Sequence, residues 1–432
     1  MTKAQMLALA LVAAPSALHA DTARDPLLPY LDDKPPTIVR EIAGPIVNPH
    51  GDVPLLEGVT VRQVVFSSRN DSEIYALIAT PNTPGKHPGM LVLHGGGGSS
   101  EQLKAMYWAQ RGYTVVAPDL PGISSPVLPV SHGTWSSLKY GDGRWVADPD
   151  ASQSVIFDAV LSGMKSLYLL RSLPDVDKSR VGVVGISWGG YMTTMICGLA
   201  GDKVKAGFAI YGCGFFDLSG QPALAKLPED KRQMWMNTLD AGRRAPKMKA
   251  AYFLASATND FFGWPQAGQA TIDAIPGNKN HVFAANDNHH ANVPGGTVFE
   301  TAPSAPFVPT PFQPFPTPTG AKANWLAMEV PYFEYHLKGI GQPFPIVTVE
   351  KATDLRAFRF RVASTRPITK ATVYWAAPDH DVLKRVWTPV PATKASDGSY
   401  TADIPANATD WYALVSDDRP VSVSSNMVHV DP

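Results

Sequence analysis

The chain has 432 residues, a formal net charge of −1 and 17% charged residues, so it has no overall attraction to nucleic acid or to an anionic membrane surface. Its 35 glycines and 40 prolines indicate many loops and exclude a helical bundle. The length is sufficient for a large core and for two or three domains.

The N-terminus has the pattern of a secretory signal peptide over residues 1–20. Lys3 precedes an apolar run at residues 6–14, and small residues follow up to Ala20, where cleavage is expected. We therefore expect a periplasmic or secreted protein, and no later apolar run is long enough to span a bilayer. The proline-rich residues 21–57 are expected to form an extended N-terminal arm.

From residue 58 onward, β-branched runs alternate with helix-compatible segments. A hairpin is predicted over residues 59–80, and later strands and helices follow in turn; the strands lie at 88–94, 113–117, 181–186, 203–211, 250–258 and 281–285, and the main helices at 101–111, 152–172, 267–275 and 324–338. This alternation predicts a mostly parallel sheet covered on both faces, an α/β catalytic domain over residues 58–340.

The stretch VGVVGISWGGY at residues 181–191 carries the clearest chemical signal. A buried strand leads into a G-x-S-x-G turn centred on Ser187, and a helix follows. A serine at the top of such a turn has unfavourable backbone angles, and its neighbours must lack side chains. The pattern predicts a nucleophilic serine. An ordinary glycine-rich turn between a strand and a helix is the alternative.

Four glycines follow the strand at residues 88–94, in the sequence HGGGG at 94–98. Backbone N–H groups without neighbouring Cβ atoms can approach an anion, which is what an oxyanion hole requires. A flexible turn would have the same composition. The position after a strand and before the serine turn favours the oxyanion hole.

Two insertions are candidates for the walls of the site. Residues 123–150 contain Trp135 among Gly, Ser and Asp, and we expect them to form a roof that contacts substrate. Residues 226–249 carry seven basic and three acidic residues, including Arg243 and Arg244. We interpret this segment as a basic rim that attracts an anionic substrate, with a solvated helical surface as the alternative.

An acid and a base are expected on loops after later strands, in the order Ser, Asp, His. Asp260 follows the strand at 250–258, and Asp217 is its rival, just beyond the preceding strand. His289 and His290 follow the next strand, and only one of them can reach the serine, because neighbouring loop residues point in different directions. His289 is favoured slightly.

A metal site is not expected from these residues, since no third ligand occurs at a recognisable spacing. The two cysteines, Cys197 and Cys213, are expected to be free and buried. Cys197 lies about 15 Å along the helix that leaves the serine turn. Cys213 is expected at the opposite end of the next strand, too far away for a disulfide.

The ordered set HGGGG, APDLPG, GISWGG, ATNDFF and NDNHH resembles the α/β-hydrolase superfamily. It is most similar to the branch containing dienelactone hydrolases, acetylxylan esterases and prolyl-oligopeptidase-like enzymes, and the similarity covers roughly residues 58–340. The chain also resembles bacterial poly(aspartic acid) hydrolases, which are exported and have a small C-terminal β domain.

The resemblance implies roles for individual residues. Ser187 would be the nucleophile, His289 or His290 the general base, and Asp260 the group that orients the imidazole. The oxyanion donors would be the backbone N–H of Trp188 and one N–H from Gly96 or Gly97. No cofactor is implied.

The remainder of the chain departs from the simple pattern. Prolines alternate with phenylalanines over residues 293–320, which we interpret as a strap near the histidine loop. From residue 345 to 432 seven short strands with period-two alternation predict an immunoglobulin-like β-sandwich. Binding of polymer, a homodimer interface and simple cover of the hydrolase domain are equally compatible with it.

Three functions follow, in decreasing order of support. The first is an exported hydrolase of carboxylic esters, acting on a small or polymeric acyl substrate. The second is an amide hydrolase, a peptidase or a poly(aspartic acid)-type depolymerase, which the basic segment favours. The third is a binding module with an inactive serine turn.

Overall fold

In the computed structural model of the chain, the residues described are 25–46, 54–124, 130–287, 289, 325–350, 356–379 and 381–430. The expected signal peptide and the expected strap at 293–320 lie outside them. Within these ranges, no helix combines the length and the apolar character needed to cross a membrane.

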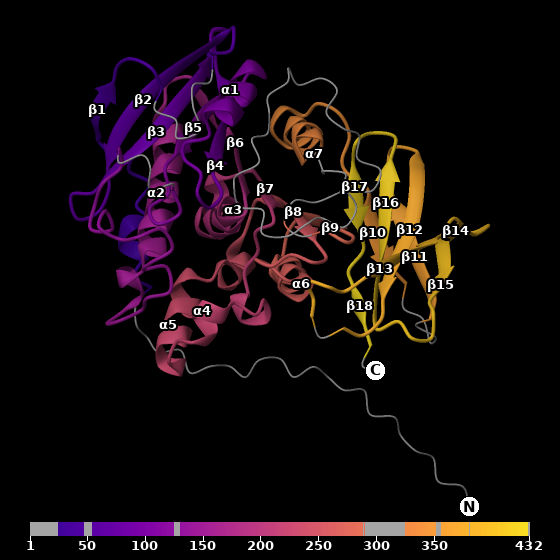
Figure 1. The fold of residues 1–432 in the computed structure, drawn as a ribbon. Helices are drawn as coiled ribbons and strands as arrows, with labels where there is room; N and C mark the ends of the chain where they lie inside the picture. The colour runs from indigo at the N-terminus through magenta and orange to yellow at the C-terminus, as the bar shows by residue number, and fades with distance from the viewer. Residues whose placement is uncertain are drawn as a thin grey trace, which may run out of the picture.

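Among the described residues, nine strands form one mixed sheet (Figure 1). In order across the sheet they are β1 (Ile38–Ile42), β2 (Val59–Ser67), β3 (Glu73–Pro81), β5 (Thr114–Pro118), β4 (His87–Leu93), β6 (Val176–Ile186), β7 (Ala206–Ile210), β8 (Ala251–Ala257) and β9 (Lys279–Ala284). The pairs from β1 to β5 are antiparallel. Those from β5 to β9 are parallel, so the predicted α/β fold is confirmed.

Helices cover both faces of this sheet. They are α1 (Gln102–Gln110), α2 (Val155–Ser172), α3 (Trp188–Leu199), α4 (Pro222–Ala225), α5 (Glu229–Leu239), α6 (Pro265–Ala274) and α7 (Trp325–Phe333), which a π-helical turn at Glu334–Lys338 continues. Successive residues of a strand point to opposite faces, so Val183 and Val184 of β6 enter different cores. One core contains α1 and α7, and the other contains α2 and α3.

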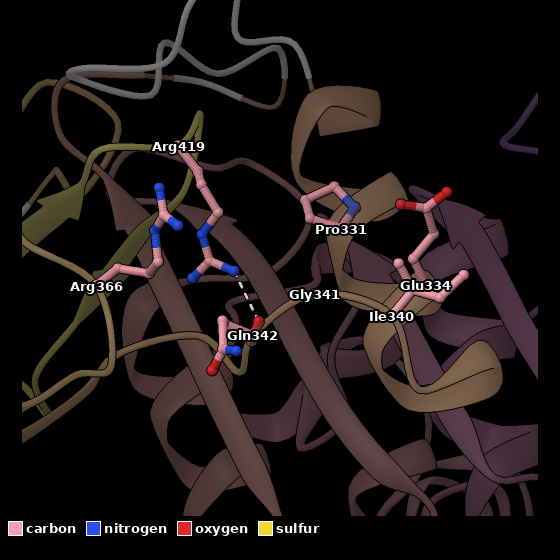
Figure 2. Close-up of a pocket in the computed structure, with 7 residues that line it drawn as sticks. All are labelled: Pro331, Glu334, Ile340, Gly341, Gln342, Arg366 and Arg419. Atoms are coloured by element: carbon pink, nitrogen blue, oxygen red, sulfur yellow. Dashed lines mark hydrogen bonds between the residues drawn. The ribbon is translucent and has the colours of Figure 1, made fainter.

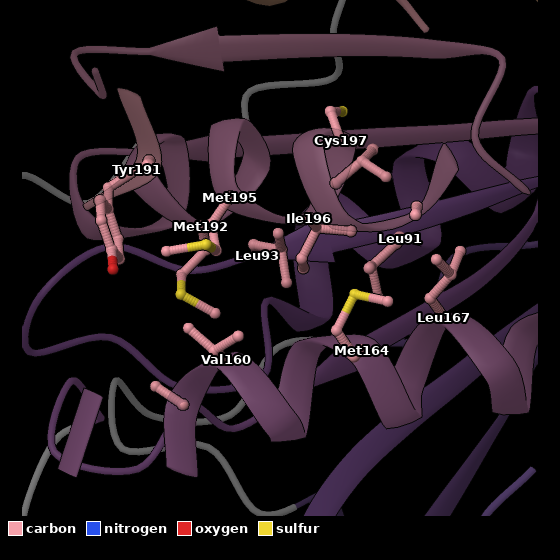
Figure 3. Close-up of a cluster of buried hydrophobic side chains, with 14 of the residues drawn as sticks. Leu91, Leu93, Val160, Met164, Leu167, Tyr191, Met192, Met195, Ile196 and Cys197 are labelled. Atoms are coloured by element: carbon pink, nitrogen blue, oxygen red, sulfur yellow. The ribbon is translucent and has the colours of Figure 1, made fainter. Parts of the chain in front are cut away.

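The core on the α2 and α3 face is closely interdigitated (Figure 3). Leu91 and Leu93 of β4 face side chains of both helices, among them Val160, Met164, Met192 and Ile196. These residues are between 0% and 1% exposed. Burial of this apolar surface holds α3, and therefore the turn before it, firmly on the sheet.

The proline-rich arm differs from the expectation, because part of it belongs to the sheet. Ile38–Ile42 forms β1 and pairs with β2 at the sheet edge. Leu27 is fully buried in the same core as α2 and α3. The run at 38–42 is therefore an edge strand, and the prolines of the arm lie before and after it, where no ladder hydrogen bond is required.

The strands after residue 345 form two antiparallel sheets, which confirms the predicted β-sandwich. One sheet has the order β10 (Ile346–Val349), β11 (Ala357–Ala363), β15 (Tyr400–Asp403), β14 (Thr393–Lys394). The other has the order β13 (Trp387–Pro391), β12 (Ile368–Ala376), β16 (Asp410–Asp417), β17 (Ser422–Ser424), with β18 (Val428–His429) paired to β16. The sandwich packs against β9 of the large sheet, where the Phe283 N–H donates to Ser424 Oγ at 2.9 Å.

A small pocket lies between the end of α7 and the sandwich (Figure 2). Two arginines line it together with Pro331, Glu334, Ile340, Gly341 and Gln342. Both are already ion-paired, Arg366 with Asp418 and Arg419 with Asp417. None of the predicted site residues lines this pocket.

Candidate active site

Ser187 occupies the sharp turn between β6 and α3. Its backbone is strained, with φ 58° and ψ −121°, and its N–H donates to Ile210 O at 2.8 Å. A Cβ on Gly185 would lie 2.3 Å from Gly189 O, and one on Gly189 would lie 2.2 Å from Leu93 O. Glycine is therefore required on both sides of the serine, which explains the pattern read in the sequence.

His289 and Asp260 meet this serine in a continuous hydrogen-bonded chain. His289 Nε2 lies 2.8 Å from Ser187 Oγ, and His289 Nδ1 lies 2.8 Å from Asp260 Oδ1. Asp260 is 0% exposed and His289 is 5% exposed, whereas Ser187 is half-buried. An Nδ1–H donated to the carboxylate leaves Nε2 as an acceptor for the serine hydroxyl proton.

Asp217, the rival acid, is not in this chain of contacts. Asp217 is ion-paired with Arg243 at 3.2 Å, and its side chain is 42% exposed. His290 lies outside the described residues. Among the described residues, the acid beside His289 is thus Asp260, which also accepts a hydrogen bond from the Phe262 N–H at 2.7 Å.

Three aromatic rings enclose the imidazole of His289. The ring centres of Phe261, Tyr211 and Phe262 lie 4.6, 4.8 and 5.7 Å from that of His289. They fix the ring plane and exclude water from the contact with Asp260. Sequence reasoning did not assign them a role, although Phe261 and Phe262 directly follow the predicted acid and Tyr211 directly follows β7.

The structure distinguishes between the two donors expected as alternatives in the glycine loop after β4. The Gly97 N–H donates to Ile123 O at 2.8 Å, which leaves Gly96 as the candidate of the two. Among the described residues, no hydrogen-bond acceptor meets the N–H of Gly96 or of Trp188. A Cβ on Gly96 would lie 3.1 Å from Trp188 Cδ1, so Gly96 lies against the side chain of Trp188.

Buried polar groups hold this loop in position. His94 is 0% exposed and contacts Gly95 O at 2.7 Å through Nδ1 and the Leu120 N–H at 3.0 Å through Nε2. Asp119 accepts from the Ser100 N–H and from Ser131 Oγ. Burial raises the pKa of Asp119 to about 6, against the lowering effect of these two hydrogen bonds.

The inserted segment before α2 covers the serine turn, as expected, but through residues other than Trp135. The Trp145 ring centre lies 5.8 Å from that of Trp188 and 4.6 Å from that of Trp235. The Tyr140 hydroxyl is 2.7 Å from the position of a Cβ on Gly96. Trp135 is half-buried in the core on the α2 face, so its expected contact with substrate is not supported.

Arg144 lies in the same roof, where no acidic side chain of the described part of the chain pairs with it. Its guanidinium carbon is 4.4 Å from the Tyr140 ring centre and 5.1 Å from that of Trp188, while Nε donates to Gly122 O at 2.9 Å. Nη2 is buried and donates to no partner among the described residues, none of which places a carboxylate within 4.0 Å of the guanidinium. Sequence reasoning missed this residue because it lies outside the basic segment.

The basic segment does not supply the expected pair of substrate-binding arginines. Arg244 is 5% exposed, forms an ion pair with Asp25 and donates to Thr238 O, so its charge is internal to the fold. Arg243 is paired with Asp217. The expectation for Arg244 is therefore corrected, because its partner in the N-terminal arm neutralises it.

Neither a disulfide nor a metal cluster is found in the part of the chain that the structure describes. Cys197 and Cys213 are free and buried, which confirms the expectation for both thiols. Groups of three or more His, Cys, Asp or Glu placed to hold a metal ion do not occur among the described residues.

One family model and several solved structures are similar to this chain. The family model of acetyl xylan esterase (AXE1) matches residues 52–215, which include the glycine loop and the serine turn. The structure is similar to acetyl xylan esterase 1 from Thermoanaerobacterium sp. JW/SL YS485, with 19% identity and a TM-score of 0.52, covering 61% of this chain and 87% of that one. An acetyl xylan esterase from Paenibacillus sp. R4 gives 19% identity, a TM-score of 0.51 and the same coverages.

Proposed function

We propose that the chain is a hydrolase of the α/β-hydrolase superfamily and that it cleaves carboxylic esters through an acyl-enzyme formed on Ser187. The observation that carries the proposal is the chain of two 2.8 Å contacts from Ser187 through His289 to Asp260. The match to the acetyl xylan esterase family model favours an ester as the bond that is cleaved.

Each group has one task in the proposed reaction. His289 Nε2 takes the hydroxyl proton while Ser187 Oγ attacks the carbonyl carbon, because a neutral hydroxyl is a poor nucleophile. The resulting oxyanion accepts hydrogen bonds from the N–H groups of Trp188 and Gly96. Asp260 holds the imidazole in the required tautomer and stabilises its charged form. Collapse releases the alcohol, which receives the proton from His289.

The second half of the reaction repeats these steps with water. His289 removes a proton from a water molecule, which attacks the acyl carbon of the ester formed on Ser187. The new oxyanion occupies the same two N–H groups, and its collapse returns the proton to Ser187 Oγ and releases the carboxylic acid. The enzyme is regenerated without any other reactant.

Labelling with a fluorophosphonate tests the proposal. We expect the parent chain to be labelled once, on Ser187, and to hydrolyse p-nitrophenyl acetate, and Ser187→Ala to lose both properties. Ser179→Ala, at the other end of β6 and exposed, is the matched control and should behave as the parent. Labelling of another residue, or turnover by Ser187→Ala, would contradict the assignment.

A second candidate is a substrate whose acyl part carries a carboxylate, as in an acidic polyamide. Arg144 favours it, because this arginine has no acidic partner among the described residues and lies against Trp188, directly after the proposed nucleophile. An incoming carboxylate would neutralise a cation that no described carboxylate pairs with. On this proposal Arg144, and not Arg243 or Arg244, binds the anionic group of the substrate.

Two substrates distinguish the candidates. We propose that Arg144→Met raises the KM for an acidic polyamide, or for an ester with a carboxylate in its acyl group, and leaves the KM for p-nitrophenyl acetate unchanged. Arg243→Met is the control, since Asp217 already neutralises that side chain. A preference for neutral esters, unaltered by Arg144→Met, would reject the anionic substrate and leave the esterase proposal intact.

We also propose that the protein is exported, on the evidence of the first 20 residues of the sequence. Expression in a bacterial host with a secretion pathway should give a mature chain that begins at Asp21 outside the cytoplasm. The intact mass and the N-terminal sequence of the recovered protein measure this. A chain that keeps Met1 and stays in the cytoplasm would contradict it.

A further inference from the structure

The loop that carries His289 is hydrogen-bonded to the backbone of the C-terminal sandwich. Asn286 Nδ2 donates to Trp387 O at 2.7 Å, and the Trp387 N–H donates to Asn286 Oδ1 at 2.7 Å. These two hydrogen bonds fix the plane of the Asn286 side-chain amide, because the amide both donates to and accepts from one residue of the sandwich. Asn286 has φ 57°, a conformation that asparagine tolerates better than most residues.

The loop that carries Asp260 is held by the same part of the sandwich. Asn259 Nδ2 lies 2.7 Å from Arg385 O, 3.1 Å from Val382 O and 3.3 Å from Leu383 O. Asn259 is 5% exposed and is the residue immediately before Asp260. A single side-chain amide therefore contacts a row of carbonyls that belongs to the C-terminal region.

The two loops are also bonded to each other. The Asn259 N–H donates to Asp287 O at 2.9 Å, and the Asn286 N–H donates to Thr258 Oγ1 at 2.9 Å. They follow β8 and β9, and β9 is the last strand of the large sheet. Among the described residues, no further strand of that sheet lies beyond β9, and the sandwich packs on this side (Figure 1).

We propose that residues 382–387 of the sandwich position the acid and the base of the active site through Asn259 and Asn286, which act as positioning residues. The contact sets the distance between Asp260 and His289, because each asparagine lies within three residues of one of them. This inference rests on the proposed triad. It gives the C-terminal sandwich a part in catalysis through its backbone groups.

Variants of the full chain test the inference. Asn259→Ala removes the contact with the three carbonyls, and Asn286→Gly removes the pair of bonds to Trp387 while accepting the positive φ. Asn280→Ala is the matched control: Asn280 Nδ2 donates to Pro345 O at 2.6 Å, but at the other end of β9. The Ser187→Ala variant measures whether turnover depends on the proposed nucleophile.

Two readouts are needed, and one of them does not depend on turnover. For p-nitrophenyl acetate we expect kcat to fall roughly tenfold to a hundredfold in Asn259→Ala and Asn286→Gly, with KM within about twofold of the parent. The low-field proton resonance of the His289–Asp260 hydrogen bond should weaken or shift in both. Asn280→Ala should keep the parent's kcat and resonance, whatever its melting temperature.

Unchanged kcat and an unchanged resonance in the two loop variants would overturn the inference, as would an equal loss of kcat in Asn280→Ala. If one loop variant does not fold, the other decides the question. Should Ser187→Ala retain turnover, the proposed function fails, and the resonance still reports whether the sandwich positions the two side chains.

Discussion

Asp260 Oδ1 lies 2.8 Å from His289 Nδ1, although the two residues belong to different loops and are separated by 29 residues of chain. Both side chains are almost completely excluded from solvent. A carboxylate in this environment determines which nitrogen of the imidazole carries the proton. The state of the base therefore depends on a residue that never touches the serine.

The first prediction concerns Asp260→Asn. An amide Nδ2 in place of a carboxylate oxygen favours the tautomer with the proton on Nε2, so His289 can no longer accept from Ser187. We expect kcat for p-nitrophenyl acetate to fall by roughly 10⁴, with little change in KM. Asp217→Asn, which breaks only the ion pair with Arg243, should retain activity. The reverse result would move the acid role to Asp217.

The second prediction concerns the serine turn. Gly189→Ala forces a Cβ to within 2.2 Å of Leu93 O, and backbone on both sides cannot retreat without separating α3 from β4. We expect a loss of about 3 kcal/mol or more in the free energy of unfolding, at the upper end of overpacking effects. A Cβ on Gly277 would meet nothing within 4 Å, so Gly277→Ala is the control. Urea unfolding measures both, and equal stabilities would contradict the close approach.

The third prediction concerns pH. Burial raises the pKa of Asp119 to about 6 from 3.8, so between about pH 4 and pH 6 the folded chain binds more protons than the unfolded chain at this site. The contribution of Asp119 to stability is therefore largest in acid and is lost as pH rises through 6, a loss of about 2–3 kcal/mol. Asp119→Asn should remove this dependence.

The measurement compares the free energy of unfolding of Asp119→Asn and of the parent at pH 4 and pH 7. The comparison is needed because burial lowers the pKa of His281 to about 4, which gives an effect of the opposite sign in the same range. His281 is present in both chains, so its effect cancels in the difference. A difference that is the same at both pH values would show that Asp119 is not responsible.

The fourth prediction concerns the thiols. Burial raises the pKa of both Cys197 and Cys213, and the thiolate is the reactive form. The folded protein should therefore not react with Ellman's reagent at pH 8, whereas the chain unfolded in guanidinium should release two equivalents. An unfolded chain that releases none without a reductant would indicate a disulfide.

The features predicted correctly from sequence are those with a local signature. The glycines around Ser187 are required by close backbone approach within a single turn, and the β-branched strands recur at spacings that determine a parallel sheet. Asp260 and the pair His289 and His290 were predicted because their loops follow consecutive strands of that sheet, and the choice between the two histidines stayed open. Chain order alone then placed the serine, the acid and the histidine pair at one edge.

The features that were missed depend on contacts between distant segments. Arg244 was expected at the substrate because it lies in the basic segment. Its ion pair could not be foreseen, since its partner, Asp25, lies 219 residues earlier in the sequence. Gly96 and Gly97 could not be distinguished as oxyanion donors from sequence, because the hydrogen bond from the Gly97 N–H to Ile123 O has no sequence pattern. The side chain of Asn259 contacts backbone carbonyls. Every residue has a backbone carbonyl, so no residue type in the C-terminal region predicts these contacts.

The reciprocal bonds between Asn286 and Trp387 join positions 101 residues apart. A domain that only tethers an enzyme can be exchanged by gene fusion, since nothing in the partner depends on its shape. Here a foreign sandwich would have to place backbone carbonyls at the same positions relative to the histidine loop. The two halves of the gene are therefore constrained to evolve as one unit, and recombination between them should rarely yield an active enzyme.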